Sequence, residues 1–176
     1  MKKELIIHFS FMIAFVAGAS VVRNWTTFAY WPVWAGAILG TILPDIDNLI
    51  HTLFLSSQGV AGDLRSTPFR QKFTKSLGLM YAPREENSEP IFHSAQFQLV
   101  FLVFAFLLVT SSSSLFGIGL VLAFMLHLVI DQAVDYMEKG NINQWFKEFP
   151  LDLDSHKKLL YLVANGLMLL VFGFFL

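Results

Sequence analysis

His127 and Asp131 lie four residues apart near the end of an apolar run that begins near Leu115. On an α-helix this spacing places an imidazole and a carboxylate side by side on one face. Two such groups can bind one divalent cation, and an ionisable pair is costly inside a membrane-spanning segment, where it usually marks a functional site. The pair therefore predicts a metal site within a membrane helix.

Composition supports a membrane protein and limits the ligands available to a metal. Of the 176 residues, 55% are hydrophobic and 14% are charged, whereas soluble domains are about half apolar and a quarter charged. A formal net charge of −1 gives no basic surface, so we expect no nucleic-acid partner. The chain has no cysteine, which excludes thiolate sites and leaves histidine, aspartate and glutamate as strong ligands.

The apolar runs predict an all-α fold, a polytopic bundle of about five transmembrane helices that forms one domain over residues 1–176. We keep the first run as a span, because it is long and Gly18-Ala19-Ser20 is a weak signal-peptide cleavage site. Gly36 and Gly40 would let another helix approach the second span closely. The last span carries no acid or histidine and is expected only to pack. The predicted spans cover residues 5–22, 28–43, 91–110, 115–134 and 158–176.

Two polar segments separate these spans. Residues 56–90 are predicted to form an interfacial loop or lid, because apolar residues recur at helical spacing between basic ones from Phe69 to Met80. The connector at 141–156 contains Trp145 and Phe149, which are expected to anchor at the membrane interface.

The distribution of Lys and Arg predicts the orientation. Basic residues favour the cytoplasmic side of short loops. With the N-terminus inside, only Arg23 of the 12 Lys and Arg residues falls outside. We therefore expect a multi-pass protein of the cytoplasmic (inner) membrane, with a cytoplasmic N-terminus and a cytoplasmic 56–90 loop.

This topology brings more ionisable residues to the depth of the first pair. Each has an ordinary alternative: His8 as an interfacial histidine, and Asp45 and Asp47 as a helix cap. Their coincidence at one depth favours a shared metal site instead. His51 and His156 lie on the same side in looser positions and are expected to be solvated. The predicted site contains His8, Asp45, Asp47, His93, His127 and Asp131.

These motifs, in this order, resemble the YdjM-like family of bacterial inner-membrane proteins. The similar residues are His8, Gly40-x-x-x-Pro44-Asp45-x-Asp47, His93-Ser94 and His127-x-x-x-Asp131, and the resemblance extends from His8 to about Pro150. That family is described as metal-dependent hydrolases and is linked by name to LexA binding. The order of motifs is also distantly similar to zinc-dependent phospholipase C and the single-strand-specific zinc nucleases. The resemblance implies that the six residues of the predicted site are ligands.

The chain departs from the family pattern at two places. Family members commonly carry a histidine soon after the second aspartate and an Arg-Gly pair before His-Ser. Here Asn48 follows Asp47, and Ile91-Phe92 precedes His93. Both departures leave the proposed ligands in place and put the details of substrate contact in doubt.

The ligand types suggest a mechanism. Imidazole and carboxylate ligands suit one or two divalent ions, with zinc first and manganese or iron as alternatives. Such a site hydrolyses phosphoesters through a metal-activated water whose pKa falls towards about 7. Asp47 or a nearby carboxylate could act as general base, and Ser94 as a donor to substrate, with a helix N-cap as its alternative role.

A site at the cytoplasmic interface points to a membrane lipid or a lipid-linked phosphoester as substrate. Two other functions fit the same ligands. One is a divalent-cation transporter, which would place ligands along a path through the membrane. The other is a non-catalytic scaffold whose metal staples the helices, with the lysine-bearing loop binding a protein partner.

Overall fold

The structure is a computed structural model that describes residues 2–46, 91–151 and 153–176, and within these ranges all regular elements are helical. Asp47, His51 and the predicted 56–90 lid lie outside the described residues. The predicted all-α class is confirmed for the described part of the chain. The α-helices are α1 (Lys2–Val22), α2 (Trp31–Ile42), α6 (Ala95–Ser111), α7 (Leu115–Lys139) and α8 (Ser155–Phe174), and the 3-10 turns are η1 (Phe28–Tyr30), η2 (Leu43–Asp45) and η4 (Asn143–Phe146).

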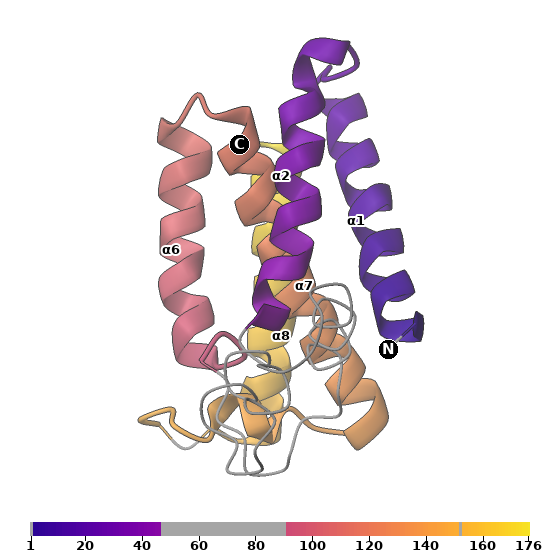
Figure 1. Cartoon of the computed structure of the whole chain (residues 1–176). Coiled ribbons are helices and arrows are strands. Elements are labelled where there is room, and N and C mark those ends of the chain that lie inside the picture. The colour runs from indigo at the N-terminus through magenta and orange to yellow at the C-terminus, as the bar shows by residue number, and fades with distance from the viewer. Residues whose placement is uncertain (1, 47–90, 152) are drawn as a thin grey trace, which may run out of the picture.

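Successive helices alternate in direction, as Figure 1 shows. The start of α1, the end of α2, the start of α6 and the end of α7 all lie at the lower end of the bundle in this view, and the C-terminus lies at the upper end. This alternation brings segments that are far apart in the sequence to one end of the molecule.

Three of the five α-helices are long and apolar enough to cross a membrane: α1, α7 and α8. The other two are shorter, with 17 residues in α6 and 12 in α2. At about 1.5 Å per residue, α2 is only about 18 Å long, against a hydrocarbon core of about 30 Å. Three of the about five predicted spans therefore correspond to helices that are long and apolar enough to cross a membrane.

Helix α7 is the centre of the bundle, and residues 121–128 are all buried. Helix α2 packs directly on its backbone, because glycines line the contact. A Cβ atom at Gly36 would lie 2.0 Å from the Phe116 carbonyl oxygen, and one at Gly40 would lie 2.1 Å from that of Leu120. Gly119 of α7 meets Val33 of α2 in the same way. The predicted close approach at Gly36 and Gly40 is confirmed, and its partner is α7.

The chain turns back under the bundle after α7. Gly140 ends this helix with φ of 71°, in the left-handed region that glycine adopts without strain. The turn carries η4 against the beginning of α6, where Trp145 and Phe146 are buried together with Phe124 and Leu128 of α7. The connector is therefore packed against the same end of the bundle to which the predicted ligands come.

Candidate metal centre

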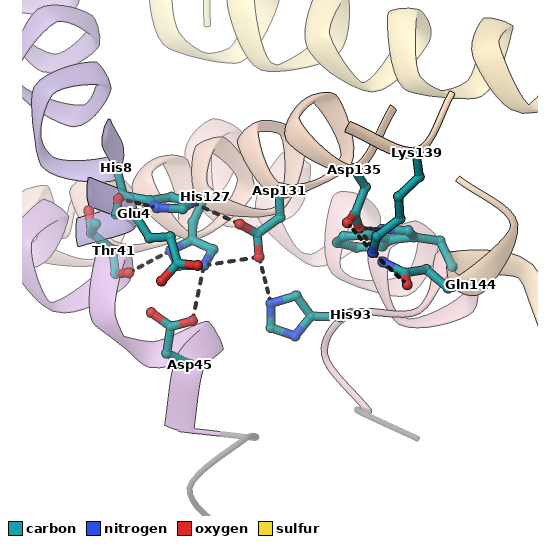
Figure 2. Close-up of polar contacts among 11 residues, drawn as sticks. Glu4, His8, Thr41, Asp45, His93, His127, Asp131, Asp135, Lys139 and Gln144 are labelled. Carbon is teal, nitrogen blue, oxygen red and sulfur yellow. Dashed lines mark hydrogen bonds and ion pairs between the residues drawn. The ribbon is translucent and has the colours of Figure 1, made fainter. Parts of the chain in front are cut away.

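Five of the six predicted ligands lie close together (Figure 2), and the helix ends that carry them meet at the lower end of the bundle in Figure 1. The sixth, Asp47, lies outside the described residues. The cluster is assembled from four separate segments, and Asp45 and all three histidines have no more than 8% of their surface exposed. Its members are His8 of α1, Asp45 of η2, His93 just before α6, and His127 and Asp131 of α7.

Asp131 is at the middle of the cluster. Its Oδ1 lies 3.0 Å from Nε2 of His8, and its Oδ2 lies 2.9 Å from Nε2 of His93 and 3.5 Å from that of His127. The same His127 atom is 3.5 Å from Oδ1 of Asp45. Two atoms bound to one tetrahedral zinc by bonds of about 2.1 Å are about 3.4 Å apart. The spacing therefore fits a shared ion, and this His/Asp group could hold a metal.

Backbone carbonyls orient two of the imidazole rings. Nδ1 of His127 lies 2.7 Å from the Thr41 carbonyl oxygen, and Nδ1 of His8 lies 2.9 Å from that of Glu4. A carbonyl can only accept, so each Nδ1 carries a hydrogen, and in the neutral ring the lone pair of Nε2 would be directed into the cluster. Metal-binding histidines are commonly held in this way.

The Nε2 atoms of His8 and His127 are consistent with this role. Both are buried, and neither has a hydrogen bond of ordinary geometry within the described ranges. The two rings stack with their centroids 4.0 Å apart. Two positively charged rings at this distance would repel each other, so the stack disfavours protonation of both rings at once.

The donor atoms form two overlapping groups. One contains His8, His127 and Asp131, and the other contains Asp45, His93 and His127. Because the Thr41 carbonyl occupies Nδ1, His127 offers only Nε2 and can bind one ion. The donor set therefore suits either one ion, or two ions that divide the remaining ligands between them.

The two orienting carbonyls are functional groups that the sequence analysis did not identify. Glu4 precedes His8 by four residues, so its carbonyl lies one turn away on the same helix. Thr41 lies in the last turn of α2, where carbonyls lose their helical partners, and Pro44 has no N–H with which to replace them. The proline is the sequence signal that could have indicated a free acceptor.

Ser94 and His156 lie outside the cluster. The Ser94 hydroxyl is the N-cap of α6, accepting from the Phe97 amide at 3.3 Å and donating to the Ile91 carbonyl at 2.9 Å. This is the alternative role considered for it. Donation to a substrate stays a prediction, and it would require breaking the bond to Ile91. His156 is exposed at the start of α8, consistent with a solvated side chain.

A second polar group surrounds Asp135, one helical turn beyond Asp131. Its carboxylate accepts from Lys139 Nζ at 2.8 Å, from Trp145 Nε1 at 2.8 Å and from Gln144 Nε2. Trp145 is only 1% exposed. The prediction that Trp145 anchors at the membrane interface is therefore wrong, because a buried partner for the indole N–H holds the ring inside the protein.

Other buried polar groups connect helices away from the cluster. Gln132 Nε2 of α7 donates to Gln98 Oε1 of α6 at 2.7 Å, and both side chains are almost fully buried. The Tyr161 hydroxyl of α8 donates to the Ala95 carbonyl at 2.9 Å. Helix α8 contributes no residue to the cluster, and this bond fixes it to the start of α6.

Two ionisable groups outside the long apolar helices have shifted pKa values. The pKa of Asp154 is lowered because the backbone N–H of Lys157 donates to its carboxylate at the N-cap of α8. Burial lowers the pKa of Arg23, whose guanidinium lies 4.2 Å from the centre of the Trp25 ring at the opposite end of the bundle.

Comparison with known proteins adds no relative to these observations. No family model matches the chain, and neither a curated protein nor a solved structure matches it. The resemblance to the YdjM-like family therefore stays a prediction based on the motifs quoted above.

Proposed function

We propose that the chain is a metal-dependent hydrolase of the cytoplasmic membrane that cleaves a phosphoester in a lipid or lipid-linked molecule. One observation carries the proposal: donor atoms from four segments converge in a buried cluster, with two of the imidazoles turned into it by backbone carbonyls. The resemblance to the YdjM-like hydrolases implies the same chemistry for the same residues.

The proposal treats all five α-helices as spans, with the N-terminus in the cytoplasm. Helices α2 and α6 are short, but they run antiparallel to their neighbours over the same bundle (Figure 1). Lys139 and Lys147 are at the cluster end of the bundle and Arg23 is at the other end. The positive-inside rule for Lys and Arg therefore favours a cytoplasmic cluster.

The ligand types favour zinc, with manganese or iron as alternatives and with one or two ions bound. A bound ion would polarise a phosphoryl oxygen and lower the pKa of a water towards about 7. Asp131 faces all three imidazoles, and Asp45 lies beside His127. Asp47, which follows Asp45 by two positions, is proposed as the general base.

The strongest alternative is a scaffold stabilised by metal. A single ion in the cluster would connect α1, η2, α7 and the segment before α6, and this would stabilise the bundle without catalysis. Transport is less well supported. Away from the cluster, the buried polar side chains of the described helices are amides and hydroxyls such as Gln98, Asn165 and Ser20, and a second set of strong ligands is not found there.

The test is a metal analysis followed by a substrate screen. Protein purified in detergent is analysed for bound elements, and then incubated with phospholipids, isoprenoid phosphates and generic phosphodiesters. We expect bound zinc and hydrolysis of at least one substrate, and we expect His127→Ala to abolish both. His156→Ala is the matched control, because it removes an exposed histidine at the same end of the molecule.

The outcomes separate the three functions. Metal binding without turnover, together with a lower melting temperature in His127→Ala, would identify the scaffold. Movement of the ion across liposome membranes would identify a transporter. In Asp47→Asn, loss of turnover with metal retained would identify a base, whereas loss of both would identify a ligand.

A further inference from the structure

An aromatic ring connects the Asp135 group to the metal centre. The indole of Trp145 donates its Nε1 hydrogen to Asp135 at 2.8 Å, and its ring centre lies 5.5 Å from that of His93, with 59° between the ring planes. Nε2 of His93 in turn lies 2.9 Å from Asp131. Asp135 therefore reaches the cluster through Trp145 and His93.

Asp135 itself is poorly suited to bind a metal. Its oxygens accept from the ammonium of Lys139, the amide of Gln144 and the indole of Trp145. Lys139 Nζ also donates to Gln144 Oε1 at 3.0 Å, so the donors support one another. A carboxylate that already accepts these bonds can hold the indole in place and has little capacity left for a cation.

His93 differs from the other two histidines in its backbone. His8 and His127 are inside α1 and α7, whereas His93 lies in the turn before the N-cap of α6. A turn constrains the direction of a side chain less than a helix does, so the ring depends more on what packs against it. Trp145, which is 1% exposed, supplies a rigid face there.

We propose that Asp135 and Trp145 are positioning residues that fix the ring of His93 for metal binding. Asp135 accepts from the indole and fixes its position, and the indole limits rotation of the imidazole. The connector after α7, which contains Trp145, then contributes to the metal centre by positioning one of its ligands. This inference rests on the metal centre of the proposed function, and it is independent of what that centre hydrolyses.

The experiment measures Co²⁺ binding by the intact chain in detergent, through the visible absorption of the bound ion. Supporting residues of metal ligands typically contribute about 10- to 100-fold in affinity. We expect a loss of this size in both Trp145→Ala and Asp135→Ala, with a changed absorption spectrum. Asp135→Asn keeps an acceptor for the indole and should recover most of the affinity. Asp154→Ala, which removes an exposed carboxylate on α8, is the matched control and should bind Co²⁺ like the wild type.

A double-mutant comparison tests the connection itself. Trp145→Phe keeps an aromatic face beside His93 and loses the N–H, so a further Asp135→Ala change should alter the affinity little. Thermal unfolding without metal and size-exclusion chromatography show which variants are folded, and Trp145→Phe, which removes the N–H that Asp135 accepts, replaces an alanine variant that is not.

Two results would overturn the proposal: an Asp135→Ala protein with the affinity and spectrum of the wild type, or effects of Asp135→Ala that are equally large with and without the indole N–H. A wild type that binds no Co²⁺ would overturn the metal centre as well. A wild type that binds Co²⁺ and hydrolyses nothing overturns only the hydrolase, because the positioning result is read from the bound ion.

Discussion

Asp131 and Asp135 are the same residue type, one turn apart on α7, and their side chains are similarly buried, with 17% and 13% exposed. Their neighbours differ. Asp135 is surrounded by an ammonium, a carboxamide and an indole, all of which donate hydrogen bonds to it. Asp131 is surrounded by the Nε2 atoms of three imidazoles.

The difference shows where the structure could hold a cation. Side chains of the protein supply the hydrogen bonds that the Asp135 carboxylate accepts. At Asp131, the carbonyls of Glu4 and Thr41 accept the Nδ1 hydrogens of His8 and His127, so these rings, when neutral, would present lone pairs to the carboxylate. Lone pairs directed at one another are unfavourable until a proton or a metal cation lies between them. The direction of the imidazoles, more than the number of ionisable residues, distinguishes the candidate metal site.

The largest expected effect is the difference between neutralising Asp131 and neutralising Asp135, measured as the change in melting temperature on adding a chelator. A bound ion stabilises the fold by about 2.7 kcal/mol when its free concentration is one hundred times its Kd. We expect a chelator to lower the melting temperature of the wild type and of Asp135→Asn. Asp131→Asn should be insensitive to the chelator, because it has lost a central ligand of the cluster.

Thermal unfolding with and without the chelator, followed by fluorescence, measures this difference. An Asp131→Asn protein that still responded to the chelator like the wild type would remove Asp131 from the site. An Asp135→Asn protein that no longer responded would show that the two acids have the same role, and the comparison would fail.

A second change alters the position of α2 while leaving both acids in place. A Cβ atom at Gly40 would lie 2.1 Å from the Leu120 carbonyl oxygen, so Gly40→Ala must push α2 away from α7. Overpacking of this kind costs about 1–3 kcal/mol. It should also weaken metal binding, because α2 carries Thr41 and leads directly to Asp45.

Gly166→Ala is the control for this change, because its added Cβ would meet only a Val129 methyl group at 4.0 Å. The two alanine variants should therefore differ in thermal stability, measured by unfolding, and in Co²⁺ affinity, measured by titration. Equal behaviour of the two would contradict the close contact between α2 and α7.

A third buried polar group on α7, the Gln98–Gln132 pair, tests whether the loss of any buried polar contact lowers the Co²⁺ affinity. Gln98→Leu leaves the Gln132 amide without its acceptor, and a buried unsatisfied polar group costs about 1–3 kcal/mol. Replacing both glutamines by leucine should recover part of this loss. Co²⁺ affinity should stay at the wild-type value in the double variant, whereas a large drop would mean that the glutamine pair belongs to the metal site.

The smallest effect concerns an acid that is fully exposed. The pKa of Asp154 is lowered from 3.8, so its contribution to stability is complete above that value and disappears as the pH falls through the lower, folded pKa. Asp154→Asn keeps a good helix cap and loses the titration. The melting temperatures of the two proteins should differ slightly near pH 6 and converge below pH 3.8. A difference that persisted in acid would exclude the carboxylate as its cause.

Much of the fold could be predicted because long apolar runs give α1, α7 and α8 directly. The short length of α2 was harder to predict, since the apolar run continues through η1 and η2 while the α-helix covers only 12 residues. Trp145 was placed wrongly because an indole suits both a membrane interface and a buried site with an acceptor. Only the position of Asp135 decides between these two environments.

The candidate site shows a similar division. Alternating helices and the spacing of His127 and Asp131 are enough to bring five of the predicted residues to one end of the bundle. The carbonyls of Glu4 and Thr41 could not be inferred from residue types, because every residue has a carbonyl and only the fold selects these two. The predicted role of Asp47 stays a prediction.

The wide separation of the ligands along the chain also affects how the protein is made. His8 is synthesised near the beginning and Asp131 much later, and ribosomes add about 5–20 residues per second. For a period on the order of ten seconds, His8, Asp45 and His93 wait without the residue that lies at the middle of their cluster. A cation bound at the proposed centre could not meet all of its ligands until α7 has emerged, so metal loading would belong to a late stage of biogenesis.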